Sequence, residues 1–180
     1  DVPIGQSETD NVEVYRWGEI KSFNFQPKEH FEVGATKNDI NFETASKVTG
    51  SRFVILSKSV ALLHRALTQY MLNTNIIDSE LTEFWTPVLV NEQSMVGTGQ
   101  LPKFRGDSYH TNEGLWLIPT AEVPLTNIGK DKIYSMEELP IRMTAATQCF
   151  RSEAGSAGKD TTGMIRQHQF EKVEMVTFCK

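Results

Sequence analysis

Apolar side chains recur at helical spacing between residues 59 and 73, which is the clearest hydrophobic pattern in the chain. One face of the expected helix collects Val60, Leu63, Leu67, Tyr70 and Met71. Ser57 or Ser59 can cap the N-terminus of this helix, because a serine hydroxyl accepts from the unpaired backbone N–H groups of the first turn. The pattern predicts a helix whose apolar face packs in the protein core.

Weaker patterns predict the elements on either side of this helix. A short helix is expected over residues 42–48, and it ends at Gly50. Residues 81–90 have the composition of a strand but are interrupted by Pro87. Proline cannot donate a backbone hydrogen bond to a sheet, so Pro87 predicts an edge, a bulge or a strand end.

The second half of the chain is dominated by strand patterns. Residues 115–119 predict a buried strand, and Thr120 can cap a short helix that follows it. Two further strands are expected over residues 143–153 and 165–178, with a glycine-containing loop between them. Strands follow one another as hairpins, so we expect an α+β fold, a largely antiparallel β-sheet flanked by helices.

Acidic side chains are concentrated at the N-terminal end. Residues 1–45 contain nine acidic and four basic residues, whereas the remaining residues contain equal numbers of each, so the formal net charge of −5 comes from this segment. A nucleic-acid-binding protein would show a strongly basic face, and the sequence does not. The 180 residues are sufficient for one domain with a substantial core.

Nothing in the composition indicates a membrane or secreted protein. The apolar runs are far shorter than the roughly 18 residues that a membrane span needs, and no signal-like segment is seen. Cys149 and Cys179 lack the spacing of a zinc site or a disulfide framework. We therefore expect a soluble cytoplasmic protein with no membrane association.

The two C-terminal strands contain the charged and aromatic residues that could form a site. Side chains alternate across a strand, so Arg151 and Glu153 are expected on one face of the first strand. Five residues share a face of the second: Arg166, His168, Phe170, Lys172 and Glu174. A solvated surface with weak ion pairs is one interpretation. The other is a site for an anion with a flat aromatic part, such as a nucleotide, because the planar guanidinium suits phosphate and carboxylate groups.

No activated nucleophile accompanies these charges. Ser152 is expected to point away from Arg151, His168 has no evident partner, and Cys149 is expected to be an unreactive thiol. Charge placement without a covalent catalyst fits phosphoryl or nucleotidyl transfer, in which positioning and electrostatic stabilisation dominate.

Several segments resemble one enzyme family. Residues 150–174, FRSEAGSAGKDTTGMIRQHQFEKVE, resemble the second signature motif of class II aminoacyl-tRNA synthetases in its seryl-tRNA synthetase form. The segments GTGQLPKF (97–104), IPTAEVPLTN (118–127) and GSRFVIL (50–56) resemble the same family. The resemblance covers nearly the whole chain and implies a class II synthetase-like core, incomplete in this chain.

The resemblance implies a reaction and residues for it. Serine is condensed with ATP to seryl-adenylate, and the seryl group then passes to the terminal ribose of tRNA(Ser). Arg151 and Arg166 are implied as the catalytic residues, on the α-phosphate and the outer phosphates of ATP. The serine site is implied to be Thr120, Ala121, Glu122 and Glu174. The ATP site is implied to be Arg151, Ser152, Glu153, Arg166 and Phe170.

The resemblance also implies a division of the chain and an oligomeric state. Residues 1–45 form an acidic N-terminal segment, residues 46–91 a dimer-interface helix and strand, and residues 92–180 the strands and loops of the serine and ATP sites. The helix and Pro87 match the first signature motif, which builds the homodimer in this class. ATP is expected as a substrate together with Mg²⁺, whose ligands are expected mostly beyond Lys180, and no metal ligand is assigned within the chain.

The chain departs from the family pattern in places. Lys159 and Thr162 occupy loop positions where the family often carries arginine, and Glu80 and Leu81 replace the usual Gly-Tyr pair. The third signature motif and the N-terminal helical arm for tRNA are not seen. We therefore expect the first part of a catalytic domain, with little or no adenylation activity by itself.

Two other functions remain open at this point. A non-catalytic synthetase-like module would keep the dimer surface and nucleotide binding; the length of the chain favours it, and the intact charged set disfavours it. A related ligase that loads amino acids onto carrier proteins would use a Cys/His/Glu zinc pocket, and the sequence shows no such cluster.

Overall fold

The computed structural model describes residues 4–33, 38–153 and 162–180, and a long antiparallel hairpin is its central feature. Strands β6 (Ile141–Phe150) and β7 (Gln169–Phe178) pair along their whole length. Strand β3 (Thr82–Glu83) adds to the other edge of β6 in parallel. The predicted hairpin is confirmed, although its strands are shorter than expected, because the first ends at Phe150 and the second begins at Gln169.

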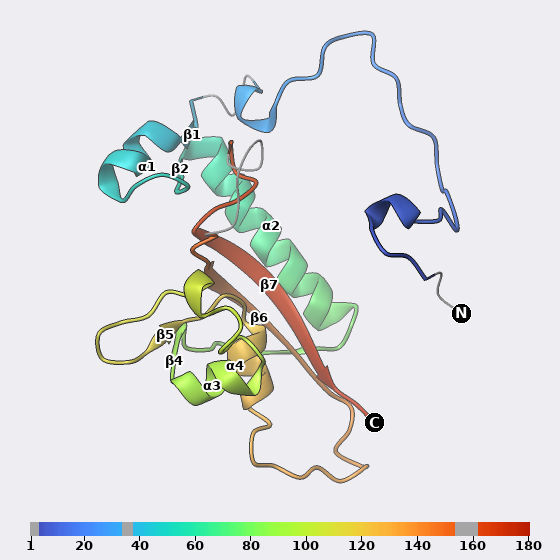
Figure 1. Ribbon diagram of the computed structural model, residues 1–180, viewed down its shortest axis with the longest axis vertical. Helices are drawn as coiled ribbons and strands as arrows, with labels where there is room; N and C mark the ends of the chain where they lie inside the picture. Colours follow the sequence, from blue (N-terminus) through green and yellow to red (C-terminus); the bar gives the residue numbers. More distant parts are fainter. Residues whose placement is uncertain (1–3, 34–37, 154–161) are drawn as a thin grey trace.

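Helices cover both faces of this sheet, as Figure 1 shows. The 20-residue helix α2 (Lys58–Ile77) lies on one face, and the short helix α4 (Glu122–Asn127) lies on the other. Alternation along β6 explains the arrangement: Met143 and Ala145 pack with Ala121 and Leu125 at α4, whereas Thr144 faces α2. The mixed α+β architecture agrees with the expected fold class.

A second, smaller group of elements lies beside α4. Strand β4 (Leu89–Val90) pairs antiparallel with β5 (Trp116–Leu117), and helix α3 (Glu92–Gly97) follows β4. Their apolar side chains form a second buried cluster that includes Met95, Trp116 and Ile118. Pro87 lies between β3 and β4, so the strand-like segment is divided at this proline, as predicted.

The apolar face of α2 does not pack in the core, so that prediction is wrong for the described chain. Leu63 and Tyr70 are 55% and 68% exposed. The helix instead turns a mostly polar stripe toward the sheet. Its members are His64, Thr68, Leu72 and Asn75.

Hydrogen bonds to the sheet explain this orientation of α2. The Thr68 hydroxyl donates to Glu171 Oε2 at 2.9 Å, and His64 Nε2 lies 2.6 Å from the same oxygen. Asn75 Nδ2 donates to Thr144 Oγ1 at 3.0 Å. Buried polar groups on the sheet require such partners, and α2 supplies them at the cost of leaving its leucines exposed.

The N-terminal part is irregular in its first residues and then forms small elements. The 3₁₀ turns η1 (Glu8–Asp10) and η2 (His30–Glu32) are separated by chain without helix or strand. Strands β1 (Ile40–Asn41) and β2 (Ile55–Leu56) pair around helix α1 (Phe42–Val48), which matches the predicted short helix.

The loop between α2 and β3 contains one strained position. Glu80 has a φ of +55°, in the left-handed region that favours glycine, and this is the position where the resembled family usually carries glycine. Leu81, which replaces the usual tyrosine, is buried at 7% exposure. Among the described residues, no helix is long and apolar enough to cross a membrane.

Candidate active site

Three side chains of β7 project from the sheet face that α4 covers. Phe170, Lys172 and Glu174 alternate along the strand, as the sequence pattern predicts. Their register partners on β6 are Cys149, Thr147 and Ala145. These β6 side chains are short, so the longer side chains of β7 extend over them toward the N-terminal end of α4.

At that end of α4, Thr120 joins two of the β7 side chains into one cluster. The Thr120 hydroxyl donates to Glu174 Oε2 at 2.5 Å, and Lys172 Nζ donates to Thr120 Oγ1 at 3.1 Å. Lys172 and Glu174 also form an ion pair. Thr120 is almost completely buried, whereas the two charged side chains are partly exposed. A buried hydroxyl therefore lies between a cation and an anion that solvent can reach.

The hydrogen-bonding capacity of Thr120 is fully used. Its oxygen also accepts from the backbone N–H of Glu122 at 3.3 Å, so the hydroxyl has one acceptor and two donors as partners. The short helix is confirmed, but its N-cap is Ala121 and not Thr120, and no side chain caps it in the usual way. Thr120 lies one residue earlier and still supplies an acceptor to the Glu122 N–H. The same contacts fix the direction in which its proton points, toward Glu174.

Arg151 lies directly after β6 and covers the Phe170 ring. Its guanidinium carbon is 5.3 Å from the ring centroid, a cation–π geometry, and its Nε donates to the Pro119 carbonyl at 3.3 Å. His168, for which the sequence indicated no partner, holds the backbone: Arg151 N donates to the His168 carbonyl, and His168 Nδ1 donates to the Arg151 carbonyl, each at 3.0 Å. Arg151 is therefore held by side chain and backbone.

Glu153 and Arg166 form a separate pair. Arg166 Nη1 lies 3.6 Å from Glu153 Oε2; the Glu153 side chain is mostly buried and that of Arg166 is nearly half exposed. Arg52 Nη1 donates to the Glu153 carbonyl at 2.8 Å.

The predicted face of five residues is therefore only partly correct. Strand geometry begins at Gln169, so alternation does not govern Arg166 or His168 of that face. It also ends at Phe150, so it does not govern the predicted pair Arg151 and Glu153 of the first strand. Glu153 has a φ of +48°, which breaks the extended backbone on which the prediction depended. These residues approach the site through the turns at the ends of the strands.

The remaining residues implied by the resemblance have supporting positions. Ala121 is completely buried in the core, so it can only fix the positions of Thr120 and Glu122 on either side. The side chain of Glu122 is exposed at the start of α4. The Ser152 hydroxyl donates to the Gly106 carbonyl at 2.9 Å, which attaches the turn after β6 to the 3₁₀ turn η3 (Arg105–Asp107).

Two further residues take part in the geometry although the implied site did not include them. Lys172 lies inside the Thr120–Glu174 cluster, and strand alternation already placed it there. Arg52 is distant in sequence, so no local pattern indicated its contact with Glu153. The Cys149 thiol behaves as expected for an unreactive group: it is fully buried, and burial raises its pKa above the ordinary value, so it stays protonated at neutral pH.

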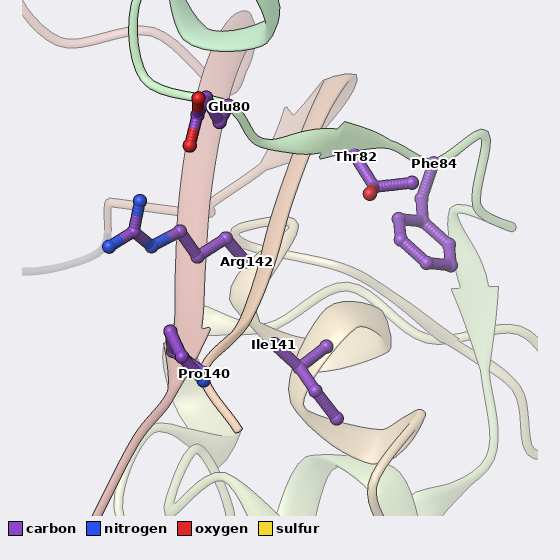
Figure 2. A pocket seen from close by; sticks show the side chains of 6 residues that line it. All are labelled: Glu80, Thr82, Phe84, Pro140, Ile141 and Arg142. Atoms are coloured by element: carbon purple, nitrogen blue, oxygen red, sulfur yellow. The ribbon is translucent and has the colours of Figure 1, made fainter. Parts of the chain in front are cut away.

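A cavity of about 500 Å³ lies at the other end of β6. Figure 2 shows side chains around it that come from the segment containing β3 and from the start of β6, including Glu80, Phe84 and Arg142. Because β6 is ten residues long, this cavity lies about 30 Å from Arg151. It is therefore separate from the Thr120–Lys172–Glu174 cluster.

Metal-binding clusters do not occur in the part of the chain that the structure describes. Within residues 4–33, 38–153 and 162–180, no three His, Cys, Asp or Glu side chains are arranged to hold a metal ion. Lys159 lies outside the described residues. Thr162, the other loop position that departs from the resembled family, is exposed.

Comparisons of the sequence point to one group of enzymes. The model of the tRNA synthetase class II core domain (G, H, P, S and T) matches residues 104–180. The chain is 58% identical over 176 residues to a serine–tRNA ligase of Paracoccus denitrificans and 55% identical over 180 residues to that of Roseobacter denitrificans. These alignments cover 98% and 100% of this chain but 41% and 42% of the relatives, so the chain spans about two fifths of their length.

Solved structures with the same fold lead to the same group. The seryl-tRNA synthetase of Pyrococcus horikoshii complexed with ATP superposes with a TM-score of 0.78 at 36% identity, over 85% of this chain and 34% of that one. The cytoplasmic serine–tRNA ligase of Naegleria fowleri in complex with AMP gives 0.72 at 31% identity, over 78% and 33%. The family model matches residues 104–180, a range that includes β6, β7 and the residues between Thr120 and Glu174 on which the site is built. We conclude that the chain belongs to the seryl-tRNA synthetase family of class II aminoacyl-tRNA synthetases.

Proposed function

We propose that this protein activates serine with ATP to form seryl-adenylate and transfers the seryl group to tRNA(Ser). The observation that carries the proposal is the Thr120–Lys172–Glu174 cluster beside the Arg151–Phe170 pair, on one face of one sheet. The first offers complementary groups for a small amino acid, and the second offers a cation and an aromatic ring for a nucleotide. The match to serine–tRNA ligases supports this combination.

In the proposed serine site, Glu174 receives the substrate ammonium and Thr120 lies beside the serine hydroxyl. In the structure, Lys172 forms an ion pair with Glu174. The ammonium of an incoming serine would therefore compete with Lys172 for the carboxylate. Because the Lys172 side chain is partly exposed, it can swing toward solvent at a small cost. When Lys172 leaves, the Thr120 oxygen loses one of its two donors, and the serine hydroxyl can replace that donor whereas alanine cannot. A site that binds a hydroxyl group with buried partners discriminates against alanine by about 10⁴ to 10⁵, since the partner would otherwise remain unpaired.

In the proposed ATP site, Arg151 contacts the α-phosphate and the serine carboxylate, and Arg166 contacts the outer phosphates. Phe170 stacks on adenine, and Glu153 and Ser152 line the site. The serine carboxylate is already ionised at neutral pH, so its attack on the α-phosphorus needs no general base. The protein must align two anions and neutralise their charge, which the guanidinium groups of Arg151 and Arg166 can do.

Mg²⁺ belongs to this proposal as an additional source of positive charge for the phosphates of ATP. The described residues offer no cluster of three ligands for it. Its ligands are therefore proposed to lie mostly outside the described residues, and the steps assigned to Arg151 and Arg166 do not depend on their positions.

The proposed reaction is tested by serine-dependent exchange of pyrophosphate into ATP. The measurement uses a protein of the length of the curated relatives that contains this sequence. We expect exchange with serine and none with alanine at the same concentration. Binding of a seryl-adenylate analogue without any exchange would contradict the proposal and would indicate a nucleotide-binding module instead.

We further propose that residues 46–91 form the contact of a homodimer, through the exposed apolar stripe of α2. Leu63, Leu67 and Tyr70 are about half to two thirds exposed, and Trp85 after β3 is 94% exposed. Large contiguous apolar surfaces of this kind mark protein–protein contacts. A second copy that covers the same stripe would remove these side chains from water.

A charge in this stripe is expected to prevent dimerisation. Leu67→Asp would bury a carboxylate in the contact of each subunit, so we expect the dimer to dissociate to monomer at micromolar concentrations, as measured by light scattering after gel filtration. The matched control is Gln69→Glu, because Gln69 lies on the opposite side of α2 and bonds to Asn73. A Leu67→Asp protein that stays fully dimeric would exclude this surface.

The proposal for tRNA and for the cell compartment follows from the reaction. The sequence has no strongly basic region, so the main tRNA-binding surface is proposed to lie outside this chain. A cytoplasmic location is proposed because aminoacylated tRNA is consumed there by translation.

A further inference from the structure

Two residues from the N-terminal part of the chain contact the segments that flank the loop between β6 and β7. Arg52 Nη1 donates to the Glu153 carbonyl at 2.8 Å, and the Arg52 carbonyl accepts from His168 N at 3.0 Å. His30 Nε2 accepts from the backbone N–H of Met164 at 2.8 Å. Each contact joins residues more than a hundred positions apart, so none of them arises from local chain geometry.

The contact at His30 is also one of close packing. Gly163 has a φ of +69°, and a Cβ atom at this position would lie 2.4 Å from His30 Cε1 and 2.7 Å from Phe31 Cδ1. Phe31 in turn packs edge-on against Phe42 of α1, with centroids 6.3 Å apart. The absence of a side chain at Gly163 thus lets the turn before Arg166 lie directly against η2.

These contacts surround the Glu153–Arg166 pair. Arg52 holds the carbonyl of Glu153 itself, and Arg166 lies midway between Met164 and His168, whose backbone N–H groups are both held. The Arg166 side chain is nearly half exposed and 3.6 Å from Glu153, a distance that gives only a weak ion pair. The position of its guanidinium therefore depends on how firmly the backbone on both sides is held.

We propose that Arg52 and His30 are positioning residues for the ATP site: they fix the backbone that carries Glu153 and Arg166. This inference depends on the proposed function, in which Arg166 contacts the outer phosphates of ATP. We call these contacts of Arg52 and His30 with Glu153, Met164 and His168 the clamp. The serine site does not depend on the clamp, because Thr120, Lys172 and Glu174 are held by α4 and β7.

The hydrogen bond from Met164 requires an acceptor atom at residue 30. A backbone N–H can only donate, so His30 Nε2 must be without a proton to accept from Met164. Glutamine places a carbonyl oxygen near the position of Nε2 and can keep the bond, whereas phenylalanine keeps the ring and loses the acceptor. His30→Gln and His30→Phe therefore separate the hydrogen bond from ring packing.

The test measures the exchange reaction in a protein of the length of the curated relatives that contains this sequence. We expect Arg52→Ala and His30→Phe each to raise KM for ATP about threefold to tenfold, the loss typical of one hydrogen bond. KM for serine should stay within about twofold of the unchanged protein, and His30→Gln should restore KM for ATP. The matched control is Arg16→Ala, whose exposed guanidinium pairs with Glu13 nearby in the chain.

Hydrogen exchange gives a second readout that needs no activity. In His30→Phe, the Met164 amide loses its acceptor and should exchange faster, while amides in β6 and β7 keep their protection. Arg52→Ala removes only the donor to the Glu153 carbonyl and keeps the backbone bond from His168 N, so faster exchange in this variant would show that the Glu153 contact also holds the turn. Unchanged KM for ATP and unchanged amide exchange in both variants would overturn the clamp. If the unchanged protein showed no serine-dependent exchange of pyrophosphate, the proposed function would fail, whereas amide exchange would still decide whether the clamp exists.

Discussion

Replacing Arg151 with alanine is expected to lower kcat of serine-dependent pyrophosphate exchange by about 10²- to 10³-fold. The guanidinium lies over Phe170 and is held by the Pro119 carbonyl, so it is organised before any substrate arrives. Removing a preorganised donor from a developing charge typically costs this much. Arg151→Lys should recover only a small part of the rate, because an ammonium cannot form the two parallel hydrogen bonds of a guanidinium.

The control for this experiment is Arg142→Ala. Arg142 is near the start of β6, at the opposite end of the strand from Arg151, where it lines the separate cavity seen in Figure 2. Its loss should leave kcat and both KM values nearly unchanged. A near-normal rate in Arg151→Ala would show that another group neutralises the α-phosphate and would remove the catalytic role from Arg151.

The second large effect is expected at Glu174. Glu174→Gln keeps the size of the side chain and an acceptor for the Thr120 hydroxyl, but it removes the negative charge that is proposed to bind the serine ammonium. Hydrogen bonds to charged groups are worth about 1.5–3 kcal/mol, so KM for serine should rise by about 10- to 100-fold. KM for ATP should change by less than about threefold. Initial rates over a range of serine concentrations give these values.

The neighbouring Glu171 supplies the matched control. It is on the same strand but points to the opposite face, where it bonds to Thr68 and His64 of α2. Glu171→Gln should leave KM for serine unchanged, whatever its effect on stability. If both glutamate variants raised KM for serine equally, the effect would come from general disturbance of β7 and the proposed serine site would be wrong.

The sequence alone determined the central hairpin and most of the site surface on β7. The alternation of Phe170, Lys172 and Glu174 has the period of a strand, and pairing with β6 conserves that period. Helix α1, the short helix after Thr120 and the division of the chain at Pro87 were also predictable, since glycine, proline and capping residues act locally.

Tertiary structure decided what periodicity could not. The same helical pattern that predicted a core face of α2 leaves Leu63 and Tyr70 exposed, because the polar partners on the sheet, Thr144 and Glu171, orient the helix. Local pattern reports which residues share a face but not which neighbour that face will meet.

The ends of the hairpin show the same limit at the site itself. Alternation stops at Phe150, so the positions of Arg151 and Glu153 follow from turn geometry and from bonds to distant residues such as Arg52. Contacts of this kind join groups that are adjacent only after folding, and their energies depend on distance in space. Sequence separation carries no information about that distance, which is why only the folded chain could place the two arginines.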